Sequence, residues 1–123
     1  MDGTTTALKE KINRLLREAA EASVALDRAD GTIVGVPHYS LIEARAHEMG
    51  RKLSREIQAR QMGEIAAQAA PFAKCPACGT RCETRSKTRR VTSVDGPLTM
   101  EEPVGHCPHC RRDFFPPPGS VGL

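Results

Sequence analysis

The stretch that decides the fold opens with Cys75-Pro76-Ala77-Cys78-Gly79 and closes with Cys107-Pro108-His109-Cys110. Each Cys-x-x-Cys pair can form a tight turn that presents two sulfurs on one side, and a β-hairpin between the pairs would bring the two turns together. The prolines pre-set the backbone φ of each turn, and Gly79 tolerates the positive φ wanted after the first pair. The sequence therefore predicts a zinc ribbon that holds one structural Zn²⁺ through four thiolates, those of Cys75, Cys78, Cys107 and Cys110.

Two alternatives for the cysteines are structural disulfides and a redox pair. The N-terminus has neither the basic region nor the apolar region of a secretory signal, and no apolar run approaches the ~20 residues of a membrane span. We therefore expect a cytoplasmic chain without a membrane-bound segment, in which reduced Cys-x-x-Cys pairs bind metal. The fifth cysteine, Cys82, is either a spare surface thiol or a competing ligand, and His106 and His109 beside the second pair could also be ligands.

Composition predicts a thin core. The 123 residues include three phenylalanines, one tyrosine and no tryptophan, so a metal would supply much of the folding free energy. His47-Glu48 begins like the His-Glu-x-x-His metalloprotease motif, but no second histidine follows. We therefore expect His47 to be a residue of the helix surface.

Two helices are predicted over residues 6–29 and 40–69. The first carries an apolar stripe with alternating steps of four and three, formed by Leu8, Ile12, Leu15, Ala19, Ala22 and Leu26. This stripe could pair with a second copy of the chain, or it could pack within an intramolecular helical hairpin, which we favour because the stripe is short. Ser40 and Glu43 form a capping-box pattern at the start of the second helix.

The remainder, residues 71–123, is predicted to be the ribbon, with a proline-rich tail. Residues 84–94 are rich in Thr and Val and predict a strand, and Asp95-Gly96 predicts a hairpin turn. Pro103 and Gly105 interrupt the return strand, which we expect to be short or at an edge. The overall prediction is an α+β fold in which a helical region, 1–70, precedes a sheet of two to three antiparallel strands.

Basic residues gather in the first predicted strand. The formal net charge of +3 comes entirely from residues 71–123, because residues 1–70 hold ten basic and ten acidic residues. Alternation along a strand places three of the cations on one face, at a spacing that suits a phosphate backbone. DNA contact is therefore predicted at Arg85, Lys87, Arg89 and Arg90. The alternative is a solvated face that keeps the ribbon soluble, and Glu101 and Glu102 on the return strand would partly neutralise the cations.

Several segments together resemble the N-terminal region of one group of bacterial insertion-sequence transposases of the DDE type. They are the cysteine pairs, Arg90-Val91-Thr92 with Gly96-Pro97, Phe114-Phe115-Pro116, Val121-Gly122-Leu123, and the part of the second helix around His47-Glu48 and Gly50-Arg51. In that group, a helical segment and a zinc ribbon precede a larger catalytic domain. The resemblance implies a zinc-dependent DNA-binding module without the catalytic part, so we expect neither enzymatic activity nor a small-molecule substrate.

Overall fold

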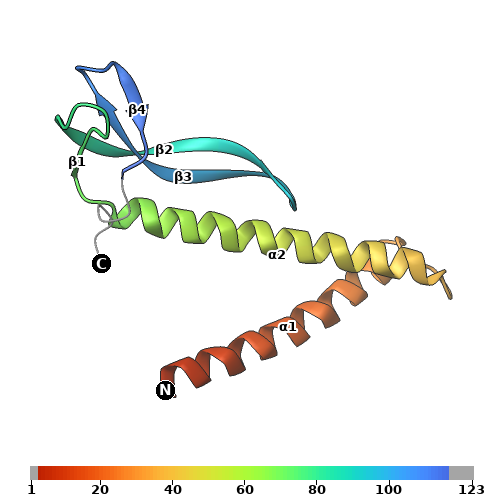
Figure 1. Cartoon of the computed structure of the whole chain (residues 1–123). Helices are drawn as coiled ribbons and strands as arrows, with labels where there is room; N and C mark the ends of the chain where they lie inside the picture. Colours follow the sequence, from red (N-terminus) through yellow and green to blue (C-terminus); the bar gives the residue numbers. More distant parts are fainter. Residues whose placement is uncertain (1–2, 117–123) are drawn as a thin grey trace. The chain divides into compact units, whose positions relative to one another are not determined.

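The computed structural model describes residues 3–116, which form two helices followed by a small antiparallel sheet (Figure 1). The helices are α1 (Gly3–Ala29) and α2 (Tyr39–Gln68). The strands are β1 (Phe72–Lys74), β2 (Arg81–Ser93), β3 (Gly96–Cys107) and β4 (Arg112–Phe114). The predicted α+β class is confirmed, with four strands instead of two or three. The predicted extension of the proline-rich tail lies outside the described residues.

The chain divides into two compact units, Met1–Met49 and Gly50–Leu123. The division falls inside α2, whereas the sequence prediction placed it at residue 70, where the helical composition ends. Both predicted helices are present, and their ends lie within three residues of the predicted ones.

A buried ion pair joins the two helices of the first unit near the turn between them. The carboxylate of Asp27 accepts hydrogen bonds from Nε and Nη2 of Arg45 at 3.2 and 2.8 Å, and only 6% of Asp27 is exposed. The amide of Ile33 donates to the carbonyl of Asp27 at 2.9 Å, and the Ile33 side chain is buried beside it. Gly31, at φ 78°, provides the left-handed residue that ends the helix. A buried charge is tolerated here because it is paired with a guanidinium.

The start of α2 differs from the prediction. The helix begins at Tyr39, so Ser40 lies inside its first turn and cannot act as the cap. The amide of Ser40 instead donates to Nδ1 of His38 at 3.1 Å, and the amide of Leu41 donates to the His38 carbonyl at 3.0 Å. The predicted capping box is wrong because the helix starts one residue earlier and His38 accepts the free amide.

The apolar stripe of α1 is solvent-exposed in the structure. Its large side chains, Leu8, Ile12, Leu15 and Leu26, are 48% to 54% exposed, and Asp27 is the one buried residue of this helix among those described. The burial expected of a packed intramolecular hairpin is therefore not found along this stripe. No described helix combines the length and apolar character needed to cross a membrane.

The sheet is a simple antiparallel succession in the order β1-β2-β3-β4. β2 and β3 pair without interruption from Thr84–Gly105 to Ser93–Gly96, while β1 and β4 add three residues each at one end. The return strand, predicted to be short or at an edge, is not short, because Pro103 is accommodated within the twelve-residue β3. Pro103 does lie at an edge, since β4 pairs with β3 only from Gly105 to Cys107.

The hairpin turn consists of Val94 and Asp95, and Gly96 opens β3 with φ 108°. Asp95 also ties this turn to the second half of α2, within the same unit. Ser54 Oγ donates to Asp95 Oδ2 at 2.5 Å, and Arg55 Nη1 donates to the Asp95 carbonyl at 2.7 Å. These polar contacts hold the far end of the hairpin, where few apolar side chains are buried.

The core of the sheet is formed largely by sulfur. Cys75, Cys82 and Cys107 are buried together, and Cys110 and Phe114 pack against them. Gly105 lies opposite Phe114 in the sheet, and the ring occupies the space that a side chain at Gly105 would need, with ring carbons within 2.9 Å of a Cβ built there. Gly105 is therefore required by packing of the ring, and it does not break the strand.

Replacing Gly105 with alanine should destabilise the ribbon, because the added methyl group collides with the Phe114 ring. We expect a loss of about 1–3 kcal/mol, typical of overpacking, measured by chemical unfolding of the metal-loaded chain. Gly50→Ala is the matched control, because nothing lies within 4 Å of the added methyl group on α2. The control should stabilise the helix by about 1 kcal/mol. Equal effects of the two substitutions would contradict this account of Gly105.

Candidate metal centre

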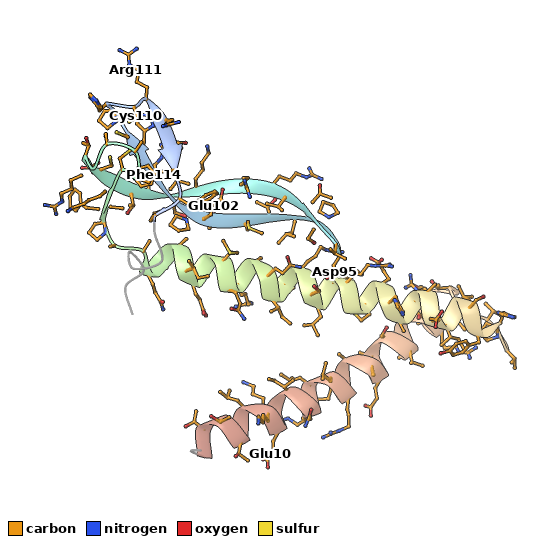
Figure 2. All side chains as sticks on the ribbon, viewed as in Figure 1. Glu10, Asp95, Glu102, Cys110, Arg111 and Phe114 are labelled. Carbon is orange, nitrogen blue, oxygen red and sulfur yellow. The ribbon has the colours of Figure 1, made fainter. Side chains whose placement is uncertain are left out.

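Four cysteine sulfurs meet at one end of the sheet. The Sγ atoms of Cys75, Cys78, Cys107 and Cys110 all lie within 4.8 Å of one another. Two of the separations are shorter still: 3.8 Å between Cys75 and Cys110, and 3.6 Å between Cys78 and Cys107. Figure 2 shows Cys110 and Phe114 at this end, while Asp95 marks the other end of the hairpin. The four ligand residues predicted from the sequence are therefore brought together.

The first pair sits on a turn between β1 and β2. The amide of Gly79 donates to the Cys75 carbonyl at 2.8 Å, and the Cys75 amide donates to the Thr80 carbonyl at 2.8 Å. Gly79 has φ 76°, which glycine adopts without a steric penalty. These bonds close the turn and direct both sulfurs toward the interior of the site.

The second pair sits on an equivalent turn between β3 and β4. The amide of Arg111 donates to the Cys107 carbonyl at 2.7 Å, which corresponds to the bond made by Gly79 in the first turn. Arg111 therefore adopts φ 58°, in the left-handed region that is costly for a residue with a side chain. The amide of Cys110 also donates to Cys107 Sγ at 3.3 Å. Both turns have the same backbone hydrogen bond, although only the first has glycine at the position with positive φ.

Hydrogen bonds give the thiols different acidities in the metal-free chain. The hydroxyl of Thr80, 3.0 Å from Cys78 Sγ, lowers the pKa of Cys78 to about 6. The Cys110 amide lowers the pKa of Cys107, because it stabilises the thiolate. The neighbouring Cys78 sulfur raises the pKa of Cys110 to about 12, because the hydrogen bond between them favours the protonated form of Cys110. A cation at the centre would favour the thiolate form of all four sulfurs.

The donor set fits a tetrahedral thiophilic ion. A metal–sulfur bond of ~2.3 Å implies sulfur–sulfur separations of roughly 3.8 Å in a tetrahedron, close to the two shortest distances between the ligand pairs. Four thiolates select zinc or iron over calcium or magnesium, which prefer oxygen ligands. The site can therefore hold a metal ion with no coordination position left for water.

The three alternative ligands lie outside this sulfur cluster. Cys82 is 2% exposed, which rules out a surface thiol, and its Sγ donates to the Thr80 carbonyl at 3.2 Å. Burial raises the pKa of Cys82, so it remains a neutral thiol in the core. His106 Nδ1 lies 2.8 Å from Asp113 Oδ1, and His109 is exposed. Among the described residues, the cluster contains only the four predicted cysteines.

The predicted basic residues occupy two faces of the hairpin. Strand alternation places Arg85, Lys87 and Arg89 on the face that also carries the buried Leu98 and Val104. Arg90 pairs with Thr99 and lies on the opposite face. All four cations are exposed, but they do not form one continuous row.

Two of these cations already have acidic partners. Lys87 Nζ lies 3.6 Å from Asp113 Oδ2, and Arg89 Nε lies 3.1 Å from Oε1 of the buried Glu102. The neutralisation expected from Glu102 is present. Glu101 lies on the other face and accepts hydrogen bonds from the hydroxyls of Ser86 and Thr88, which lower its pKa.

Asp113 and Thr80 were not identified from the sequence. The hydrogen bond to His106 is the main cause of the lowered pKa of Asp113, and the charge of Lys87 adds to it, so this carboxylate links β4 to β2 and β3. Nothing in the sequence indicates this link, because it depends on the register of three strands. Thr80 directly follows the first cysteine turn, which is the one signal that could have identified it.

Replacing Cys107 with serine should abolish metal binding and unfold the sheet, because Cys107 belongs to the four-sulfur cluster and is a fully buried core residue. Elemental analysis should fall from one bound ion per chain to none, with loss of strand signal in circular dichroism. Cys82→Ser is the matched control, since it alters an equally buried thiol outside the cluster. Retention of one ion by the Cys107 variant would contradict the four-cysteine site.

No protein-family model, no curated protein and no solved structure matches this chain. Its fold and its sulfur cluster are therefore the findings from which a function is inferred.

Proposed function

We propose that this chain is a non-catalytic DNA-binding module whose ribbon is cross-linked by one structural Zn²⁺. The observation that carries the proposal is the exposed cationic strand β2, which is held on a sheet whose core is a four-thiol site. The zinc-ribbon part of a DDE transposase, which the sequence resembles, would have this arrangement and this role.

Zinc is favoured by the closed set of four thiolates and by the small core around them. Structural zinc sites are four-coordinate, and metal binding in such sites contributes on the order of 10 kcal/mol to folding. The ribbon needs such a contribution, since three cysteines and only three other hydrophobic residues of the sheet, Ala73, Leu98 and Val104, are buried among those described. A closed thiolate shell has no open position for catalysis, so the metal acts on folding only.

DNA contact is favoured by the charge of β2. Between Glu83 and Asp95 the strand carries four cations and no acidic residue. Arg85 and Arg90 make no ion pair with any other described residue, so both guanidinium groups are available to phosphate oxygens. Lys87 and Arg89 would contribute less, because binding DNA competes with their bonds to Asp113 and Glu102. A two-stranded ribbon such as β2–β3 has a width that the DNA major groove admits.

The test is duplex-DNA binding by fluorescence anisotropy across a salt series, with the zinc-loaded chain. Each neutralised phosphate adds about 0.9 to the slope of log K against log salt. We expect the Arg85→Ala/Arg90→Ala double variant to lower the slope by about 1.8. The Lys9→Ala/Arg17→Ala double variant on α1 removes the same charge and should leave the slope unchanged.

Absence of binding at low salt would overturn the proposal. An equal loss in both double variants would show that only the net charge matters, and it would remove β2 as the contact surface. Sequence preference, tested with unrelated duplexes, would further support a role in recognising transposon ends.

A second candidate function is self-association through α1, and the exposure of its apolar stripe favours it. The stripe follows the alternating spacing of a coiled-coil seam, and its four large side chains remain about half exposed. Pairing with a second copy would bury them, and the alanines between them allow helices to approach closely. In this role the ribbon would take no part in the binding.

Ile12→Asp combined with Leu15→Asp should lower the molar mass in solution from that of an oligomer to that of a monomer, as measured by light scattering. The change places charges in an apolar seam, where they cannot be solvated. Asn13→Asp adds a charge to the same helix off the stripe, and should leave the mass unchanged. A wild-type chain that is monomeric at high concentration would exclude this function.

A further inference from the structure

Beyond the short outer strands β1 and β4, the β2–β3 hairpin has two long outer edges, one formed by β2 and one by β3. These two edges differ in their backbone hydrogen-bond donors. β1 pairs with β2 only at Arg81, Cys82 and Glu83, and β4 pairs with β3 only from Gly105 to Cys107. The Thr84 amide donates to the Pro71 carbonyl, which shows that even-numbered residues of β2 direct their backbone groups to the outer edge. The same alternation directs the odd-numbered residues of β3 to its outer edge.

Prolines close the outer edge of β3. Pro97 and Pro103 pair with Thr92 and Ser86, and both lie at odd-numbered positions whose backbone nitrogen faces outward. Neither nitrogen carries a hydrogen, so this edge lacks two of the donors that another strand would need. Their placement leaves the ladder between β2 and β3 intact and blocks extension of the sheet on this side.

The outer edge of β2 remains open. Thr88, Arg90 and Thr92 direct amides and carbonyls outward, and no backbone hydrogen bond joins them to another segment within residues 3–116. Every side chain from Arg85 to Arg90 is exposed along this edge. β2 therefore offers a row of unpaired backbone groups that an extended chain could bond to.

The positive charge of β2 determines which kind of extended chain can pair with its outer edge. Four cations, Arg85, Lys87, Arg89 and Arg90, border the edge, and no acidic residue of β2 lies among them. Lys87 and Arg89 also bond to Asp113 and Glu102 on the neighbouring strands, so Arg85 and Arg90 supply most of the free positive charge. Pairing with β2 of a second copy would place cations opposite cations, which is unfavourable in a sheet. An acidic strand would place carboxylates opposite the same side chains.

We propose that the outer edge of β2 binds an extended acidic peptide segment of a partner protein as an additional antiparallel strand. Backbone bonds at Thr88, Arg90 and Thr92 would hold the peptide. Glutamate or aspartate at every second position would face Arg85, Lys87 and Arg89, which share one face of the sheet. This interaction goes beyond the proposed DNA binding, because it depends on backbone donors that a nucleic acid does not require.

The probe is an acetylated, amidated peptide of about seven residues that alternates glutamate and valine, which matches the open length of the strand. Its binding to the zinc-loaded chain is measured by fluorescence anisotropy or calorimetry. With the glutamates on the cationic face, the valine amides point toward β2. N-methylation of the valines should abolish binding, while N-methylation of the glutamates should preserve it, since their amides point away.

The matched protein variants are Thr88→Pro and Thr99→Pro. Both positions direct their amide outward, Thr88 on β2 and Thr99 on β3, so neither change removes a bond between the two strands. Thr88→Pro should weaken peptide binding about tenfold or more, because a central donor is lost. Thr99→Pro should leave peptide binding unchanged. Circular dichroism and metal content should confirm that both variants fold.

Three results would overturn the proposal: no peptide binding, equal sensitivity to the two methylation patterns, or equal effects of the two proline variants. In the first case, the cations would serve to protect the edge from aggregation. In the second, the peptide would bind as a general polyanion. DNA binding should be insensitive to Thr88→Pro, so failure of this proposal and failure of the DNA proposal are distinguishable.

Discussion

The convergence of four thiols at one end of the sheet is the constraint on which the ribbon depends. Cys75, Cys107 and the neighbouring Cys82 are the buried core at this end, and Phe114 covers them. Hydrogen bonding within the cluster lowers the pKa of Cys78 and raises the pKa of Cys110. A metal ion bound by all four thiolates would add its binding free energy to folding. The left-handed conformation of Arg111 lets the second turn present its sulfurs as the first one does.

Away from the sulfurs, the hairpin is held by polar contacts. Lys87 and Arg89 bond to acidic groups on neighbouring strands, and Asp95 fastens the turn to α2. The Lys87 and Arg89 side chains are about half exposed, so solvent screening weakens their ion pairs. They do decide how much positive charge is available to a ligand. The strand that looks uniformly basic in sequence therefore offers its free charge mainly through Arg85 and Arg90.

The two outer edges of the hairpin differ in their backbone donors and in their charge. This difference affects which molecules can pair with each edge. Prolines at Pro97 and Pro103 remove donors from one edge without disturbing the ladder, whereas the other edge keeps its donors and adds cations. Removing backbone donors with proline and adding charged side chains are both known ways of preventing an edge strand from pairing with another chain. Because the prolines and the cations lie on opposite sides of the hairpin, the outer edge of β2 keeps its backbone donors, whereas the outer edge of β3 lacks two of them.

The sequence by itself determined the class of fold, both helices and the four cysteines of the sulfur cluster. Those features depend on local spacing: the repeat of apolar residues along a helix and the two Cys-x-x-Cys turns that each chain segment forms alone. The helix cap at His38, the length of β3, the role of Gly105 and the partners of Lys87 and Arg89 were decided only by tertiary structure. Each depends on the register between strands or on where a helix begins. A shift of one residue would change every one of these contacts while leaving the sequence pattern the same.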